Sequence, residues 1–286
     1  MSKTSPHDLT REIRQTALSC GFDAVGICRA EVLQPERDRY VQWLDRGSHG
    51  SMKWLTRDWA QRATDPGSLL PDARSIVCVA LSYSGRPALP TPVGSGRLAR
   101  YAGGEDYHAL MRRLLAKLCR EITARTGTVR PFVDTAPTMD KALAARAGIG
   151  WQGKNTNILS HGLGSLTFLG GIVTDLDLAP DEPARDGCGA CRACAVACPT
   201  GALRGDYTID ARLCISYLTI EHRGPIPREL RPLVGDWVFG CDICQDVCPP
   251  VTARQDAAHP DFRARRIAHV RTLMRDGAVA EIDGRP

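Results

Sequence analysis

Residues 188–199 read CGACRACAVACP and residues 241–249 read CDICQDVCP, with Cys214 between the two runs. Together they place eight cysteines within a short stretch of the chain. The first run has the Cys-x2-Cys-x2-Cys-x3-Cys-Pro spacing of bacterial ferredoxins, and eight thiolates are the ligand count of two cubane iron–sulfur clusters. The pattern therefore predicts a ferredoxin-like module that holds two [4Fe-4S] clusters and moves single electrons.

The spacing also predicts which sulfurs share a cluster, because the fourth cysteine of such a run ligates the other cluster. The crossed assignment places one cluster on Cys188, Cys191, Cys194 and Cys248, and the other on Cys198, Cys214, Cys241 and Cys244. Structural zinc is the alternative. Paired Cys-x2-Cys zinc knuckles would not need a three-cysteine run that ends in Cys-Pro, so the clusters are favoured.

Composition and targeting signals limit the class of protein. The chain has 286 residues, a net charge of +5 and a pI near 8.6, which permits a polyanionic partner without requiring one. The start, MSKTSPHDLTREI, has no apolar signal-peptide core, and no apolar stretch approaches the ~20 residues of a membrane span. Four further cysteines are scattered among apolar neighbours, which does not suggest a secreted disulfide framework. We expect a cytoplasmic monomer with no membrane partner.

Apolar periodicity divides the chain into three parts. Strands and helices alternate over residues 1–180, which predicts an α/β (α+β) domain; a ferredoxin-like 2×[4Fe-4S] domain follows at 181–250, and a basic tail at 251–286. Helices are expected at 5–20, 36–47, 106–124 and 135–148. Strands are expected at 22–28, 75–83 and 129–134, with a hairpin of 155–160 and 165–175.

The cluster module accounts for too little of the chain to be the whole protein, so we expect it to feed an attached active site. The first strand is not followed by G-x-G-x-x-G, and there is no P-loop motif. The glycine-rich stretch GIGWQGKN at 148–155 ends an expected helix instead of beginning one, so it lacks the helix N-terminus that binds a pyrophosphate. The simpler interpretation is that a glycine ends the helix here. Binding of a nicotinamide cofactor or a nucleotide triphosphate is therefore not favoured.

Several segments resemble the epoxyqueuosine reductase family. They are GSMKWLTR (50–57), Arg62, LPDARS (70–75), RYA (100–102), DYH (106–108), VDTAP (133–137), RAGIGWQGKNT (146–156) and CDICQDVCP (241–249). The resemblance covers residues 1 to about 250. It implies a cobalamin-binding catalytic domain, related to that of reductive dehalogenases, beside the two clusters. The implied reaction reduces the epoxide of epoxyqueuosine, at the wobble position of certain tRNAs, to the alkene of queuosine, the last step of queuosine biosynthesis.

The resemblance also assigns roles to single residues. Asp134 is implied as the proton donor, although on sequence alone Asp134 or Thr135 could instead N-cap the following helix, with Pro137 inside it. The implied cobalamin contacts are Arg57, Asp134, Lys154, Asn155, Ile158, Leu169, Ser216, Arg223, Cys241 and Asp242. The Asp-x-His-x-x-Gly pattern of a histidine ligand to cobalt is incomplete, since Met111 stands at the glycine position. We expect no histidine on the cobalt, and expect His108 and His222 at the surface or behind the site.

Substrate and partner predictions are less specific. We expect Arg97, Arg100 and His222 to contact tRNA; Arg112, Arg113, Lys117 and Arg120 could face its phosphates or form a solvated helix face. Many family members carry a longer C-terminal helical-repeat region that helps to hold tRNA, so we expect weak tRNA binding here. The low-potential electron donor is not identified. The alternatives are a cytoplasmic corrinoid-dependent reductive dehalogenase and a plain ferredoxin-type electron-transfer protein.

Overall fold

The computed structural model describes residues 5–84, 96–103, 106–124 and 127–252. Its base is a four-stranded sheet in the order β1-β2-β7-β4, in which every neighbouring pair is antiparallel. The strands are β1 (Ala24–Arg29), β2 (Ser75–Ser82), β4 (Val129–Val133) and β7 (Thr167–Thr174). β2 is buried along its whole length because it lies inside the sheet and both of its faces are covered. The predicted α/β (α+β) class is confirmed, in its antiparallel α+β form.

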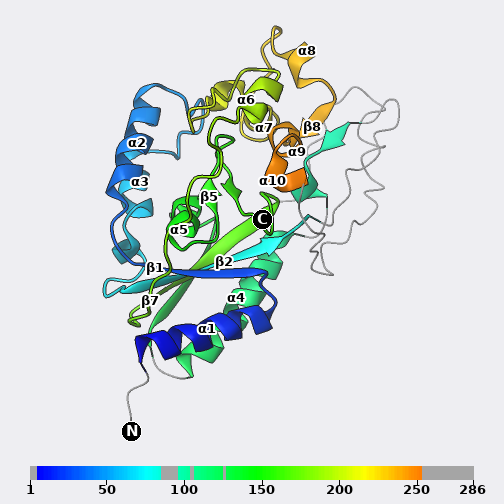
Figure 1. Ribbon diagram of the computed structural model, residues 1–286. Helices are drawn as coiled ribbons and strands as arrows, with labels where there is room; N and C mark the ends of the chain where they lie inside the picture. Colours follow the sequence, from blue (N-terminus) through cyan, green and yellow to red (C-terminus); the bar gives the residue numbers. More distant parts are fainter. Residues whose placement is uncertain (1–4, 85–95, 104–105, 125–126, 253–286) are drawn as a thin grey trace.

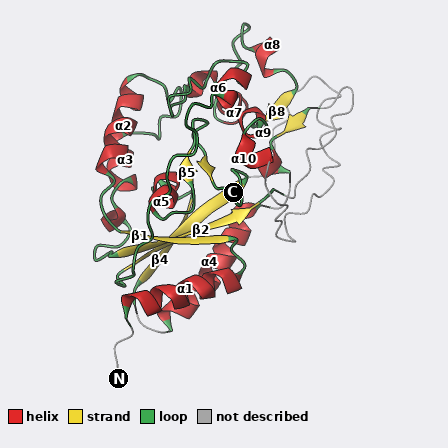
Figure 2. Cartoon of the chain, viewed as in Figure 1, coloured by secondary structure: helices red, strands yellow, loops and turns green. Residues whose placement is uncertain are grey.

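One face of the sheet is covered by α1 (Pro6–Cys20) and α4 (Tyr107–Thr123), which lie below it in Figures 1 and 2. Both helices begin where their capping residues predict. The Ser5 side chain accepts from the backbone N–H of Asp8, and the Asp106 side chain accepts from that of His108. Buried side chains at helical spacing, such as Ile13 and Leu118, form the core with the strands.

The other face carries α5 (Asp140–Arg146), whose Leu143 packs with Cys78 of β2 and Val173 of β7. The end of α5 also lies close against β1, because Gly26 of β1 has no side chain. A Cβ built there would stand 1.9 Å from the carbonyl oxygen of Ala147. The remaining helices of this part are α2 (Gln34–Asp45) and α3 (Arg57–Ala63), followed by the short η1 (Pro66–Ser68).

Two expectations for residues 134–175 are wrong. The helix expected from residue 135 begins only at Asp140, with Met139 as its N-cap, so neither Asp134 nor Thr135 is a cap; the segment between forms turns. The expected hairpin also does not form. β7 pairs with β2 and β4, whereas β6 (Ile158–Leu159) pairs with β5 (Trp151–Gln152). The long apolar strand β7 pairs with strands that are distant in sequence and not with the segment that precedes it. The expected helix stop is confirmed at Gly148, where φ is +73°.

The cysteine-rich part lies above the sheet in Figure 1. Its elements are α6 (Ala193–Ala197), η3 (Ala211–Leu213), α7 (Ile215–Ile220), α8 (Arg231–Val234), β8 (Trp237–Phe239), α9 (Ile243–Asp246) and α10 (Pro249–Thr252). A small core of its own includes Ile215, Leu218 and Trp237. The N-terminal part reaches into it through β3 (Arg97–Leu98), which pairs with β8 and continues into η2 (Arg100–Ala102).

The basic tail is expected from residue 251, and all of it after Thr252 lies outside the described residues. Among the helices that the structure describes, none combines the length and the apolar character that crossing a bilayer requires.

Gly26 offers a direct test of the packing between β1 and the end of α5. Gly26→Ala should lower the free energy of unfolding by about 1–3 kcal/mol, because the new methyl group must push the Ala147 carbonyl away. Gly162→Ala is the matched control, since a Cβ at Gly162 meets nothing within 4 Å. Denaturant titration of both variants measures the effect. Equal stability of the two would contradict the close approach.

Candidate functional site

Asp134 lies in the turn directly after β4 and is held by two aromatic residues of α4. The Tyr107 hydroxyl donates a hydrogen bond to Asp134 Oδ2, and His108 Nε2 lies 3.1 Å from Asp134 Oδ1. The other ring nitrogen of His108 lies 2.7 Å from Asp106 Oδ1. The imidazole therefore bridges two carboxylates, and the start of α4 places both partners of Asp134, Tyr107 and His108, in one turn.

Ring stacking fixes the orientation of these side chains. The Tyr107 ring lies parallel to Phe168 of β7, with centroids 4.0 Å apart, and stacks on the His108 ring at the same separation. Burial and the hydrogen bond to Asp134 raise the pKa of Tyr107, so its hydroxyl remains a donor at physiological pH. His108, expected at the surface or behind the site, contacts Asp134 directly. The resemblance marked residues 106–108, but only the structure shows what they touch.

A second pair of ionisable groups lies around Asp134. The pKa of Asp140 is raised to about 7, mainly by burial; the hydrogen bond from Thr138 opposes this rise and the charge of Asp134 adds to it. Burial also raises the pKa of Tyr101 to about 12, with the carboxylates of Asp242, Glu221 and Asp134 acting in the same direction. Tyr101 therefore lies within electrostatic reach of both Asp134 and Asp242 of the cysteine-rich part. The structure thus brings these two predicted site residues to one region.

Asp242 is buried, and only one of its carboxylate oxygens is used. Oδ2 accepts from the backbone N–H of Arg100 at 2.7 Å, whereas Oδ1 has no hydrogen-bond partner among the described residues. Burial raises the pKa of Asp242. The Arg100 guanidinium lies against Asp242 and Asp246 and its side chain is only 15 % exposed. This position does not favour the predicted contact between Arg100 and tRNA phosphates.

Asn155 lies in the loop between β5 and β6 and shows the same incomplete pairing. Its Oδ1 accepts from the backbone N–H of Asn157 at 3.1 Å, but its Nδ2 is buried without a hydrogen-bond partner among the described residues. The next residue, Thr156, has a φ of +64°, which is strained for a β-branched side chain. Buried polar atoms without partners are rare in proteins. Asn155 Nδ2 and Asp242 Oδ1 therefore fit a bound group with its own donors and acceptors, such as the peripheral amides of a corrin.

The other implied cobalamin contacts occupy varied environments. Ile158 is buried, Leu169 is half-buried on β7, and Ser216 lies in the first turn of α7. Arg57 begins α3 and pairs with Asp45, and Arg223 is exposed. Lys154 is already engaged, because its Nζ donates to the carbonyl oxygens of Gly189 at 2.6 Å and Cys191 at 3.1 Å. Lys154 therefore fastens the loop between β5 and β6 to the first cysteine run.

Of the other predicted tRNA contacts, the Arg97 guanidinium lies 4.3 Å from the centre of the Trp237 ring. The half-buried His222 places its Nε2 3.3 Å from the carbonyl oxygen of Pro225.

The eight cluster cysteines form no disulfide and lie in two neighbourhoods. Burial is the largest cause that raises the pKa of Cys241 to about 12, and Cys214 and Cys198 act in the same direction. Burial also raises the pKa of Cys244, followed by the nearby Cys241, Cys214, Cys194 and Cys198. Cys198, Cys214, Cys241 and Cys244 are the set that the crossed assignment places on one cluster. Iron fits them because a cluster replaces the thiol protons and offsets the crowding of thiolates.

The remaining four sulfurs form the second neighbourhood. Burial raises the pKa of Cys194, and the neighbouring Cys188 and Cys191 act in the same direction. Cys248 is buried in the apolar cluster against which Cys188 packs. Within the described parts of the chain, no three histidine, cysteine or acidic side chains are arranged to hold a single metal ion.

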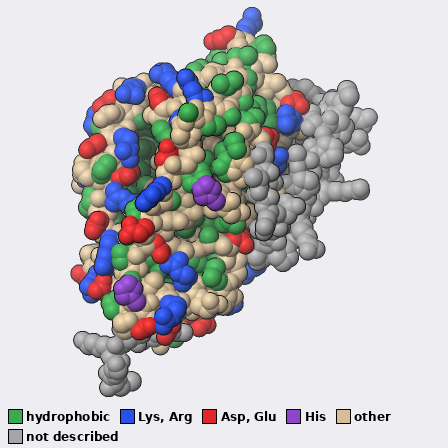
Figure 3. All heavy atoms as spheres, in the orientation of Figure 1, with side chains coloured by type: hydrophobic (Ala, Val, Ile, Leu, Met, Phe, Trp, Pro, Cys, Tyr) green, Lys and Arg blue, Asp and Glu red, His purple; other side chains and the backbone are tan. Residues whose placement is uncertain are grey.

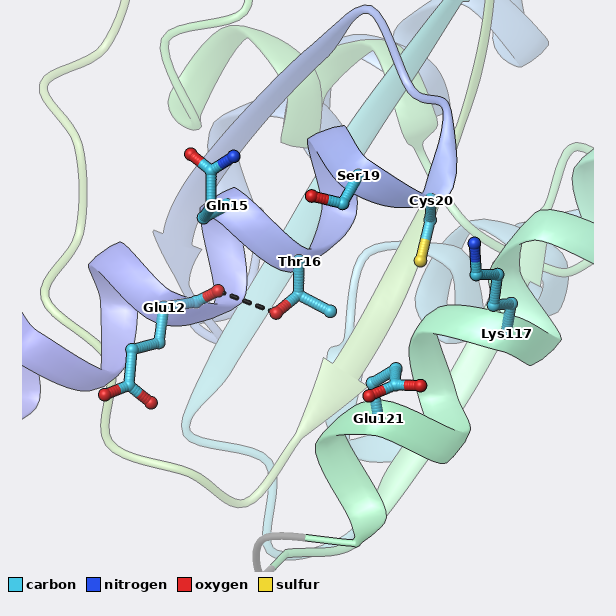
Figure 4. Close-up of a pocket in the computed structure, with 7 residues that line it drawn as sticks. All are labelled: Glu12, Gln15, Thr16, Ser19, Cys20, Lys117 and Glu121. Atoms are coloured by element: carbon cyan, nitrogen blue, oxygen red, sulfur yellow. Dashed lines mark hydrogen bonds between the residues drawn. The ribbon is translucent and has the colours of Figure 1, made fainter.

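Two hollows lie near these elements. One, of about 390 Å³, borders the Asp134 turn and is lined by residues of α4 and β4 that include Arg112, with Thr135 and Ala136 of the turn. The other, of about 520 Å³, lies between α1 and α4 (Figure 4) and is lined by Glu12, Gln15, Thr16, Ser19, Cys20, Lys117 and Glu121. None of the predicted catalytic, cofactor or cluster residues lines the second hollow.

Family models match both parts of the chain. The model described as "Epoxyqueuosine reductase QueG, DUF1730" matches residues 63–135, and that of a 4Fe-4S double cluster binding domain matches residues 187–250. The second match supports a double [4Fe-4S] module over structural zinc.

Individual proteins agree with these models. Epoxyqueuosine reductase of Escherichia coli (strain K12) is 41 % identical over 274 residues, which cover 94 % of this chain and 72 % of that protein. A crystal structure of an epoxyqueuosine reductase with an epoxyqueuosine-modified tRNA-Tyr stem loop matches with a TM-score of 0.84 and 33 % identity, covering 91 % of this chain and 70 % of the other.

A more distant structure shares the fold alone. The catabolic reductive dehalogenase NpRdhA matches with a TM-score of 0.57 and 18 % identity, over 89 % of this chain and 33 % of the other. The identity to the reductases is far higher and extends over nearly the whole chain. The dehalogenase alternative is therefore not favoured, and the chain belongs to the epoxyqueuosine reductase family.

Proposed function

We propose that this chain reduces the epoxide of epoxyqueuosine, at the wobble position of tRNA, to the alkene of queuosine. One observation carries the proposal: Asp134 is held between Tyr107 and His108 beside the part of the fold where Asn155 and Asp242 have unpaired polar atoms. A proton donor and a place for a redox cofactor thus occur together. The structure of a relative with an epoxyqueuosine-modified stem loop supports the choice of substrate.

Opening an epoxide to an alkene takes two electrons and two protons and releases one water molecule. Cobalamin, when bound, supplies low-potential electrons to the substrate, and [4Fe-4S] clusters deliver such electrons singly. Asn155 and Asp242 would hold the corrin through their free polar atoms. We expect Cys241, a cluster ligand next to Asp242 in sequence, to bring one cluster close to it.

The leaving oxygen needs a proton, and we propose that Asp134 delivers it. Tyr107 holds one carboxyl oxygen in place, and His108 reaches the other, so a spent proton can be replaced through the Asp106–His108 pair. The side chain of Asp134 is 46 % exposed in the free chain. A substrate that covers it would exclude water from the carboxyl group during the proton transfer.

tRNA is expected to present its wobble base from the anticodon loop, since proteins read single-stranded RNA by enclosing an unstacked base. Arg112 lines the hollow beside Asp134 and is exposed, which suits a phosphate contact better than the occupied Arg100. Arg97 and His222 remain candidates for further contacts. We expect the reaction in the cytoplasm, where tRNA and low-potential electron donors occur, and expect a monomer.

The direct test uses anaerobically reconstituted protein, dithionite and an anticodon stem loop that carries epoxyqueuosine. Nucleoside analysis of the product should show queuosine. Stoichiometric clusters and cobalamin without any queuosine would contradict the proposed function. A plain electron-transfer protein would contain the clusters alone.

Asp134→Asn should keep both clusters and cobalamin but lose turnover, because the amide preserves shape and cannot donate an acidic proton. General acid catalysis typically contributes about 10²–10⁴-fold, so the rate of queuosine formation should fall by that order. Asp8→Asn, in the first turn of α1 with a side chain 47 % exposed, is the control. A residual rate within a few-fold of the wild type would exclude Asp134 as the acid.

The crossed ligand assignment predicts which cluster a single substitution removes. Wild-type protein should contain about eight iron atoms, and Cys248→Ala should damage the cluster of Cys188, Cys191 and Cys194 while sparing that of Cys241 and Cys244. Iron analysis together with electron paramagnetic resonance measures the loss, with Cys119→Ala as a control outside the module. If the spectrum showed that Cys244→Ala and Cys248→Ala lose the same cluster, the assignment would be wrong.

A further inference from the structure

A basic hollow lies where α2 meets the cysteine-rich part. We infer that it is the docking surface for a small acidic electron-carrier protein, which reduces the cluster of Cys188, Cys191, Cys194 and Cys248. The inference rests on the proposed function, since that reaction needs a one-electron donor, and it names the class of that donor. It is carried by the charge of the hollow and by its place beside an exposed cluster ligand.

The hollow has a volume of about 390 Å³ and a strongly basic lining. Its lining residues are Arg39, Gln42, Trp43, Arg46, Ser48, Arg204, Thr208, Ile209, Asp210 and Arg212. Arg212 is neutralised by two hydrogen bonds to Asp210, and Arg39 pairs with Glu36. Arg46 and Arg204 are exposed and form no ion pair within the described residues. Asp206 and Asp210 lie within electrostatic reach of Arg204 without an ion pair to it, so both guanidinium groups can still pair with an acidic partner.

The walls of the hollow are held together from both sides. Trp43 Nε1 donates to the carbonyl oxygen of Ile209 at 2.6 Å. The backbone N–H of Ala211 donates to the carbonyl oxygen of Ser48 at 2.9 Å. These bonds join α2 and its following turn to the cysteine-rich part. A docking surface of fixed shape saves the cost of ordering loops when a partner binds.

The basic surface continues to the first cysteine run. Arg192 donates from Nη2 to the carbonyl oxygen of Arg204 at 3.2 Å, and Arg192 directly follows Cys191. Of the eight cluster cysteines, only Cys191 is exposed to solvent. Val196 of α6 is 83 % exposed and offers an apolar contact beside it. The cluster that includes Cys191 is therefore the one that an external carrier can approach.

Figure 3 shows several Lys and Arg side chains over the upper left of the molecule, where Figure 1 places α2 and the neighbouring end of the cysteine-rich part. The hollow beside Asp134 shares none of its lining residues with this one and is built by α4 and β4. An RNA that presents its base to Asp134 would approach those elements. The basic hollow is better placed for electron delivery, and complementary charge would speed the encounter with an acidic carrier.

Each encounter transfers one electron. The carrier is oxidised by one electron and the cluster is reduced by one, with no bond formed between the proteins. Two encounters supply the two electrons that, with two protons, convert one epoxide to an alkene and water. A brief, weak complex suits this task, because electron-transfer encounters typically bury less than about 1,200 Å².

The test measures cluster reduction without tRNA. A purified acidic flavodoxin in its hydroquinone state is mixed with the reconstituted holoenzyme in a stopped-flow instrument, and the second-order rate of cluster bleaching is recorded at several salt concentrations. Arg46→Glu/Arg204→Glu should lower that rate by about tenfold or more at low salt and weaken its salt dependence. Arg11→Glu/Lys117→Glu, on α1 and α4 beneath the sheet, makes the same change in charge and should leave the rate unchanged.

Two further measurements separate this inference from the proposed function. With dithionite as reductant, Arg46→Glu/Arg204→Glu should form queuosine at the wild-type rate; failure of the wild type itself would contradict the proposed function instead. The affinity for the epoxyqueuosine stem loop should also be unchanged. If the double variant bound the stem loop more weakly but kept its rate with flavodoxin, the hollow would belong to RNA and the docking inference would be wrong. Equal loss in both double variants would also overturn it.

Discussion

The convergence of eight sulfurs from distant positions is the constraint on which the cysteine-rich part depends. In the proposed crossed assignment, Cys198 lies with Cys214, Cys241 and Cys244, and Cys248 reaches back to the first run. The crossing brings α6 against α9, so the two runs fold as one unit. Because burial makes these thiols poor acids, iron that replaces their protons couples the stability of the module to cluster assembly.

The candidate site depends on the contact between this module and the sheet domain. β3 pairs with β8, and the backbone of Arg100, which follows β3, donates to Asp242. Tyr101 then lies within electrostatic reach of both Asp242 and Asp134. In the proposed function, the proton donor comes from the sheet domain and the cofactor contacts come from both parts. A change at the contact between them should therefore affect chemistry as well as stability.

Local signals predicted much of this fold. The cysteine spacing predicted the module, and apolar periodicity placed α1 and α4 correctly. The errors concern non-local structure. Nothing near residues 155–175 shows that β7 must pair with β2 and β4, and the turns before Asp140 follow from packing of the Asp134 loop. The contacts of Tyr107 and His108 with Asp134 span 26 or more residues and arise only when α4 and β4 come together.

The central claim is that a corrin occupies the region around Asn155 and Asp242, beside Asp134. Metal analysis and the visible spectrum of the purified, cluster-loaded protein incubated with cobalamin test it most directly. The account predicts about one cobalt per chain and a base-off spectrum, because no histidine is expected on the cobalt. Full clusters with no retained cobalamin, in a protein that still converts epoxyqueuosine to queuosine, would contradict it.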